Sequence, residues 1–275
     1  MLRLSLAQGL RTIATTATTT TPQCSRLQGK VAIVTASTDG IGFSIARRLA
    51  QEGAKVMISS RKEKNVNQAV EILTREGLKV SGLVCHVGKA EDRARLFLET
   101  KAQFGGLDIL VSNAAANPAV GPVLECQEAV WDKIFDVNVK STFMLMKEAL
   151  PLLRERKSSS IIIVSSVAAY QPFNLLGVYS ITKTSLLALC KTVADDLASE
   201  SIRVNCIAPG IIKTKFSTPL YESEAAHDLA MSKIPLQRLG TTDEIAGIAA
   251  FLASEDASYI TGETIVGAGG MLSRL

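Results

Sequence analysis

A glycine-containing turn, Thr-Ala-Ser-Thr-Asp-Gly-Ile-Gly at residues 35–42, decides the expected fold of this chain. It follows an apolar, β-branched run at residues 30–35 and leads directly into an amphipathic segment at residues 41–51. Because Gly40 and Gly42 carry no side chain, the backbone of such a turn can approach a bound pyrophosphate. The helix that follows would offer free N–H groups and the positive end of its dipole to that anion. The turn therefore predicts a dinucleotide site, the alternative being a tight turn that binds nothing.

Short strand-like runs alternate with longer amphipathic segments along the rest of the chain. The expected strands are residues 30–35, 55–59, 83–87, 107–112, 160–165, 202–207 and 263–266. The expected helices are residues 41–51, 64–76, 91–104, 128–156 and 178–199. Alternating β and α units favour right-handed crossovers and a parallel sheet with helices on both faces. We therefore predict an α/β fold, a single Rossmann-type domain at residues 29–272 with a doubly wound parallel β-sheet.

Composition restricts the other classes of protein. Of the 275 residues, 47% are hydrophobic and 20% are charged, which suits a large buried core. The net charge is +4 without a basic cluster, so we expect no nucleic-acid partner. The apolar runs fall short of the roughly 18 residues that a membrane span needs, so we expect no span. Five cysteines without a CxxC pair and two histidines predict no metal site.

The two ends of the chain resemble targeting signals. Residues 1–28 contain three arginines and many Ser and Thr residues but no acid, which is typical of a mitochondrial transit peptide or of a plain N-terminal tail. Residues 273–275, Ser-Arg-Leu, resemble the C-terminal tripeptide that directs proteins to the peroxisome. The sequence therefore predicts a location in the peroxisome, in the mitochondrion or in both.

The end of the second expected strand bears on the choice of dinucleotide. An acid at this position usually holds the ribose 2′-hydroxyl of NAD, but the chain reads Ser60-Arg61-Lys62. The Arg61 guanidinium and the Ser60 hydroxyl can instead hold the 2′-phosphate of NADP through charge-assisted hydrogen bonds. Ordinary surface charges at the start of a helix are the alternative. We predict NADP(H) as the cofactor.

A tyrosine and a lysine form the candidate catalytic group. Tyr179 and Lys183 lie four residues apart in an expected helix, so their side chains share a face. Ser166 follows a buried strand, and Asn138 lies on an earlier helix. A nearby ammonium would lower the tyrosine pKa from its usual value near 10 and so ease proton exchange at neutral pH. Simple packing of these side chains is the alternative.

Together with the glycine turn, these residues make the chain resemble the short-chain dehydrogenase/reductase family from about residue 27 to residue 270. The family's Asn-Asn-Ala-Gly motif, catalytic Asn, Ser and Tyr-x-x-x-Lys, and Pro-Gly turn fall on residues 112–115, Asn138, Ser166, Tyr179, Lys183, Pro209 and Gly210. The resemblance implies that Tyr179 is the acid/base, that Ser166 and Tyr179 bind the substrate oxygen, and that Asn138 holds a water linked to Lys183. Three departures from the family pattern are Ala36, Ala115 and His86, the last standing where many members place an Asp near the adenine.

The resemblance also implies a set of cofactor contacts and an activity. The expected contacts are Thr35, Ser37, Thr38, Gly40, Ile41, Gly42, Ser60, Arg61, Val87, Asn113, Ala114, Tyr179, Lys183, Pro209, Gly210, Ile212 and Thr214. The expected activity is NADPH-dependent reduction of ketones and aldehydes, among them aromatic ketones, α-dicarbonyls, retinal and ketosteroids. Alternatives are a 3-oxoacyl or hydroxysteroid reductase and a family member kept as an NADP-binding regulatory protein.

Two further expectations concern the substrate pocket and self-association. The apolar side chains of Phe173, Leu175, Leu176 and Leu220 predict an apolar pocket for a small-molecule carbonyl or alcohol. The resemblance implies a homo-oligomer, commonly a tetramer, formed through the helix that bears Tyr179 and the C-terminal strand.

Overall fold

The computed structural model describes residues 25–118 and 120–273, whose strands form one seven-stranded parallel sheet. The strands lie in the order β3-β2-β1-β4-β5-β6-β7. Their bounds are β1 Val31–Val34, β2 Lys55–Ser60, β3 Val80–Val84, β4 Ile109–Ser112, β5 Ser159–Val164, β6 Ile202–Pro209 and β7 Thr264–Gly267. The prediction of a single α/β domain with a doubly wound parallel sheet is confirmed.

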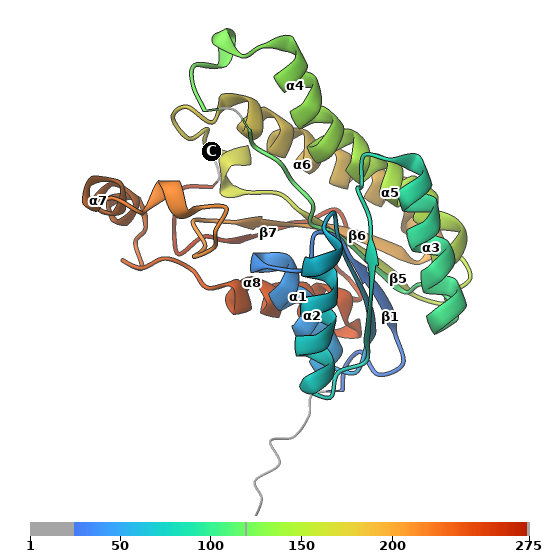
Figure 1. Cartoon of the computed structure of the whole chain (residues 1–275). Coiled ribbons are helices and arrows are strands. Elements are labelled where there is room, and N and C mark those ends of the chain that lie inside the picture. Colours follow the sequence, from blue (N-terminus) through green and yellow to red (C-terminus); the bar gives the residue numbers. More distant parts are fainter. Residues whose placement is uncertain (1–24, 119, 274–275) are drawn as a thin grey trace, which may run out of the picture.

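Helices cover both faces of the sheet, as Figure 1 shows. Their bounds are α1 Gly40–Gln51, α2 Glu63–Arg75, α3 Ala90–Phe104, α4 Glu128–Phe135, α5 Ser141–Leu153, α6 Gly177–Leu197, α7 Glu224–Lys233 and α8 Thr242–Ala253. Because side chains alternate along a strand, Ala32 and Val34 of β1 pack with α1 and α8, whereas Ile33 packs with α5 and α6. Within the described ranges, no helix combines the length and the apolar character that crossing a membrane requires.

The structure differs from the sequence prediction in three respects. The segment at residues 128–156 is not one helix, because a π-helical turn at Asp136–Lys140 separates α4 from α5. The strand expected at residues 83–87 is β3, which ends at Val84. Helices α7 and α8 were not predicted; α8 begins with a capping box in which Thr241 and Glu244 satisfy each other's backbone N–H groups.

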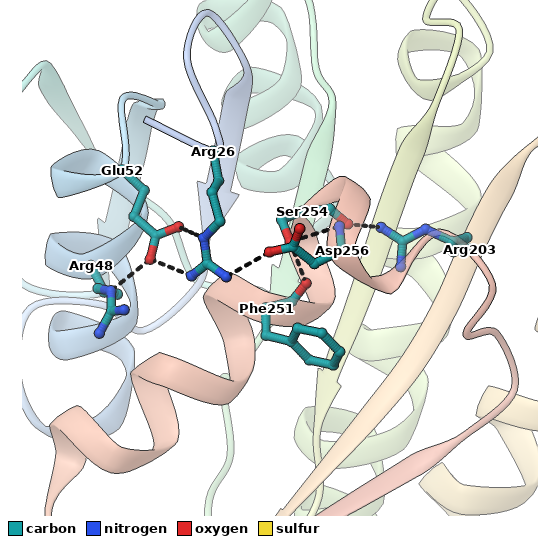
Figure 2. A network of polar contacts seen from close by, with 7 residues as sticks. All are labelled: Arg26, Arg48, Glu52, Arg203, Phe251, Ser254 and Asp256. Carbon is teal, nitrogen blue, oxygen red and sulfur yellow. Dashed lines mark hydrogen bonds and ion pairs between the residues drawn. The ribbon is translucent and has the colours of Figure 1, made fainter. Parts of the chain in front are cut away.

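A buried carboxylate ties the start of the described chain to the domain (Figure 2). Glu52, at the end of α1, accepts two hydrogen bonds from Arg26, at 2.7 and 2.8 Å, and one from Arg48 at 2.7 Å. Arg26 also donates to Asp256 at 2.9 Å, and the neighbouring Leu27 is fully buried. Arg26 and Leu27 thus pack on the domain although they fall within the segment predicted as an N-terminal tail. Of the two signals, predicted at residues 1–28 and 273–275, residues 1–24 and 274–275 lie outside the described residues.

Candidate active site

A cavity of about 480 Å³ opens at the carboxyl ends of β1, β4, β5 and β6. Strand order reverses between β1 and β4, which is where open α/β sheets bind ligands. The predicted site residues that line it are Gly40, Ile41, Gly42, Asn113, Ser166, Tyr179, Lys183, Pro209, Gly210, Ile212 and Thr214. Those outside its lining are Thr35, Ser37, Thr38, Ser60, Arg61, Val87, Ala114 and Asn138.

The glycine turn is held tightly against the end of β4. A Cβ on Gly42 would lie 2.4 Å from the Asn113 side-chain nitrogen and 2.5 Å from the Ala36 carbonyl oxygen, so no side chain fits there. Ala36 itself adopts a φ of +49°, a left-handed conformation that costs an alanine energy and a glycine almost none. At the start of α1, the Asp39 side chain accepts a hydrogen bond from Gly40 N–H at 2.8 Å. The turn therefore keeps the close backbone packing that a pyrophosphate site requires.

Two predicted cofactor residues direct their hydroxyl groups into the protein. The Thr35 hydroxyl accepts hydrogen bonds from the backbone N–H groups of Asn113 and Ala114, at 3.0 and 3.2 Å. The Ser37 hydroxyl donates to the Val34 carbonyl at 2.6 Å and accepts from Ser59 N–H at 3.0 Å. Both side chains are fully buried. Their observed role is to fix the turn between β1, β2 and β4.

Arg61 lies exposed just beyond the end of β2, within electrostatic reach of His86. His86 is fixed in place, because its backbone N–H donates to Asp92 at 2.8 Å and its Nδ1 accepts from Gly88 N–H at 3.1 Å. Burial, together with the positive charges of a lysine on α4 and of Arg61, lowers the pKa of His86. A neutral imidazole and an exposed guanidinium therefore stand together at this end of the sheet.

Ser166, Tyr179 and Lys183 converge in the cavity. Ser166 follows β5 and caps a short 3-10 turn, where its hydroxyl accepts from Ala168 N–H at 3.1 Å. Tyr179 and Lys183 are buried on the first two turns of α6, with the Lys183 ammonium 5.5 Å from the centre of the Tyr179 ring. That ammonium donates to the Val164 carbonyl at 2.9 Å. The three side chains predicted from their spacing thus lie in one place.

The expected lowering of the Tyr179 pKa by Lys183 stays a prediction, and burial is the larger influence on both side chains in this structure. Burial raises the pKa of Tyr179 to about 12, and a hydrogen bond from Ser166 opposes only part of that rise. Burial lowers the pKa of Lys183 to about 8. Each charged form loses hydration in the interior, which favours the neutral phenol and the neutral amine. At neutral pH the tyrosine is therefore a phenol, the form that can donate a proton.

Asn138 lies in the π-helical turn and contacts the site from behind. Its amide nitrogen donates to the Ala116 carbonyl and to the Thr182 hydroxyl, both at 3.0 Å. Its amide oxygen accepts from Ala116 N–H at 2.7 Å. Both N–H donors of the side chain are thus engaged by the protein. Asn138 is close to the catalytic helix, as predicted, but its amide contacts protein groups.

Apolar side chains form the wall opposite the glycine turn. Phe173, Leu176 and Leu220 line the cavity as predicted, whereas Leu175 lies outside the lining and is 46% exposed. Phe216 also lines it, with its ring centre 5.9 Å from that of Tyr179. The wall next to the phenol therefore suits an apolar substrate.

An ion pair at the rim of the cavity was not predicted. The Lys215 ammonium lies 2.6 Å from the Asp39 carboxylate, which joins the segment after β6 to the glycine turn. The two residues are 176 positions apart in the chain, and no local sequence signal relates them. Only the fold brings them together.

The fold and the site together define an oxidoreductase that uses a nicotinamide dinucleotide. Residues 35–272 match the family model described as Enoyl-(Acyl carrier protein) reductase. The chain is 56% identical to Dehydrogenase/reductase SDR family member 4 of Oryctolagus cuniculus, over 90% of this chain and 96% of that relative. The chain therefore belongs to the short-chain dehydrogenase/reductase family and is an NAD(P)-dependent enzyme.

Further relatives and solved structures agree with this assignment. The chain is 52% identical to Tropinone reductase-like 3 of Erythroxylum coca, over 91% of this chain and 96% of that one. A putative gluconate dehydrogenase from Agrobacterium tumefaciens superposes with a TM-score of 0.87 at 28% identity, covering 90% of this chain and 98% of the other. A putative short-chain alcohol dehydrogenase from Sinorhizobium meliloti gives a TM-score of 0.85 at 33% identity, with the same coverage.

Proposed function

We propose that the protein reduces apolar ketones and aldehydes with NADPH, and that Tyr179 donates the proton. One observation carries the proposal: a buried, neutral phenol lies in the cavity beside the Ser166 hydroxyl, with an apolar wall next to it. A carbonyl substrate needs both a hydrogen-bond donor and a proton donor at its oxygen during reduction. The names of the relatives, dehydrogenase/reductase and tropinone reductase, support the same reaction class.

Each residue has a defined task in this proposal. The nicotinamide supplies the hydride when the cofactor is bound. Ser166 donates a hydrogen bond to the carbonyl oxygen and stabilises the negative charge that develops there. Tyr179 transfers its phenolic proton to the same oxygen. Lys183, when protonated, stabilises the resulting phenolate and is assigned to the nicotinamide ribose hydroxyls.

The chain's own residues fit a dinucleotide. Gly40 and Gly42 have no side chains, so a ligand can approach the backbone at the start of α1. The free N–H groups of this helix end suit a pyrophosphate. Ser60 and the exposed Arg61 stand at the end of β2, where an acid would favour NAD. A guanidinium there favours the 2′-phosphate of NADP. We therefore propose NADPH as the cofactor.

Replacement of Arg61 tests the choice of cofactor. Arg61→Leu should raise the KM for NADPH about tenfold or more and leave the KM for NADH nearly unchanged, because only NADPH carries the 2′-phosphate. Lys62→Leu, at the next exposed position, is the matched control and should change both values little. An equal change for the two cofactors in Arg61→Leu would show that Arg61 does not select the phosphate.

A substrate panel tests the reaction class. Purified protein and NADPH are mixed with aromatic ketones, α-dicarbonyls, retinal, ketosteroids and a 3-oxoacyl thioester, and NADPH oxidation is followed by absorbance. Turnover of apolar ketones supports the proposal, and exclusive turnover of the thioester would favour the 3-oxoacyl reductase. Tight NADPH binding without turnover of any substrate would favour a regulatory protein.

We also propose a homotetramer and import into the peroxisome or the mitochondrion. Exposed apolar side chains on α5 and α6, Phe143 at 46% and Ile181 at 41%, support association through the helix that bears Tyr179. Light scattering of the wild type and of Ile181→Glu tests the assembly, since the variant should dissociate.

The localisation is tested with fluorescent fusion proteins. Fusions with and without residues 273–275, and with and without residues 1–24, test the two predicted targeting signals.

A further inference from the structure

Thr182 lies on α6 between the two catalytic candidates, and its side chain is fully buried. Its hydroxyl donates a hydrogen bond to the Tyr179 carbonyl at 2.7 Å and accepts one from the Asn138 amide at 3.0 Å. The hydroxyl therefore donates one hydrogen bond within its own helix and accepts another from the π-helical turn. Thr182 is the point at which the π-helical turn is bonded to the first turn of α6.

The path of hydrogen bonds continues to the segment after β4. The Asn138 side-chain amide donates a hydrogen bond to the Ala116 carbonyl at 3.0 Å and accepts one from the Ala116 N–H at 2.7 Å. Ala116 follows Asn113 and Ala115, which line the cavity next to the glycine turn. An unbroken path thus runs from the dinucleotide side of the cavity through Asn138 and Thr182 to the backbone of Tyr179.

We propose that Thr182 is a positioning residue, which holds the Tyr179 turn in register with the dinucleotide side of the cavity through Asn138. The inference rests on the proposed function of this site. Both N–H groups of the buried Asn138 amide are engaged, so loss of the Thr182 hydroxyl leaves one of them without a partner. The amide and the helical turn then shift to find another partner, and proton transfer does not tolerate displacements of about 1 Å.

Neighbouring hydroxyl groups have other partners. Ser141 donates to the Val137 carbonyl, and Thr142 donates to the Asn138 carbonyl and accepts from the Ser112 hydroxyl at 3.1 Å. Thr184, two positions after Thr182, donates to the carbonyls of Ala169 and Ser180 at 2.8 and 3.0 Å. Thr184 lies on the same helix without contacting Asn138, which makes it the matched control.

The experiment compares Thr182→Val, Thr182→Ser, Thr184→Val and the wild type with NADPH and the best ketone of the panel. Thr182→Val should lower kcat about tenfold or more and change the KM for NADPH less than about twofold, since the contacts proposed for the glycine turn and Arg61 stay in place. Thr182→Ser keeps the hydroxyl and should recover kcat to within about threefold of the wild type. Thr184→Val should lower kcat less than about twofold. If Thr182→Val does not fold, Thr182→Ala replaces it.

A double-mutant cycle separates positioning from general loss of stability. If the two side chains act through one path, Asn138→Ala combined with Thr182→Val lowers kcat little further than the worse single variant. Wild-type kcat in Thr182→Val, failure of Thr182→Ser to recover kcat, or multiplicative losses in the cycle would overturn the inference. Inactivity of the wild-type protein would instead overturn the proposed function, so the two failures are distinguishable.

Discussion

Replacing Lys183 with methionine should stabilise the folded protein while abolishing its activity. Burial lowers the pKa of Lys183 to about 8, so the folded protein at pH 7 contains an ammonium that has lost most of its hydration. Its hydrogen bond to the Val164 carbonyl, at 2.9 Å, does not remove that cost. Methionine keeps the length of the side chain and removes the charge.

The magnitude follows from the two pKa values. A change from 10.5 to about 8 corresponds to about 3 kcal/mol at 1.36 kcal/mol per pKa unit. Loss of the hydrogen bond to Val164 offsets about 1 kcal/mol. Lys183→Met should therefore raise the free energy of unfolding at pH 7 by about 1–3 kcal/mol, or several degrees in Tm for a domain of this size.

The stability difference between Lys183→Met and the wild type should depend on pH in a defined direction. Below pH 8 the lysine is protonated in both the folded and the unfolded chain, so the full burial cost is present. As the pH rises from about 8 to 10.5, the folded chain loses the proton first, and the wild type gains stability relative to its unfolded state. The advantage of Lys183→Met should therefore shrink between pH 7 and pH 10.

Urea denaturation of the protein without added cofactor measures this effect at both pH values. Lys191→Met, an exposed position on the same helix, is the control and should change stability little at either pH. A Lys183→Met variant that is less stable than the wild type at pH 7 would refute the reasoning. So would an advantage that stays the same at pH 10.

Three further changes test other parts of the structure. Ala36→Gly should stabilise the chain by about 1 kcal/mol in thermal melts, because φ is +49° there; a lower Tm would contradict this. Glu52→Gln should cost about 2–4 kcal/mol, since it leaves two arginines facing a neutral buried side chain. Glu76→Gln breaks a partly exposed ion pair and should cost less than about 1 kcal/mol, so equal losses would refute the buried-charge argument. Lys215→Met should raise the KM for NADPH about two- to fivefold by leaving the Asp39 carboxylate unneutralised at the cavity rim, and Asp39→Asn in the same chain should reverse the increase.

Local pattern was enough to predict the sheet and the first helices. The central strands are short apolar runs bounded by turns, and α1 begins at a glycine turn, so type and place follow from the residues. Helix α8 was not predicted because it lacks a clear polar face. Six of its twelve residues are buried alanine, isoleucine or leucine residues. Its capping signal, Thr241 with Glu244 three positions later, was present and would have identified it.

The break between α4 and α5 was invisible for a different reason. The π-helical turn at residues 136–140 contains neither glycine nor proline, so no residue there indicated a break and residues 128–156 were predicted as one helix. Asn138 lies in the middle of this π-helical turn. The motif thus gave the identity of the residue, but its contacts with Ala116 and Thr182 required the fold.

Motif spacing brought Ser166, Tyr179 and Lys183 together correctly, because helix geometry and strand ends are local properties. Their protonation was not predictable in the same way. Burial decides the pKa of Tyr179 and of Lys183, and burial depends on the helices and strands that pack around them. The sequence therefore predicted which groups meet, but the effect of burial on the tyrosine pKa required the fold.

Transfer of deuterium from NADPH labelled at C4 of the nicotinamide tests the central claim most directly. The wild type should move the label to the carbonyl carbon of an apolar ketone, and the product alcohol is analysed by mass spectrometry. Tyr179→Phe keeps the ring beside Phe216 and removes the proton donor, so it should bind NADPH normally and lower the rate about 1,000-fold or more. Label transfer by Tyr179→Phe at a rate near that of the wild type would contradict the account.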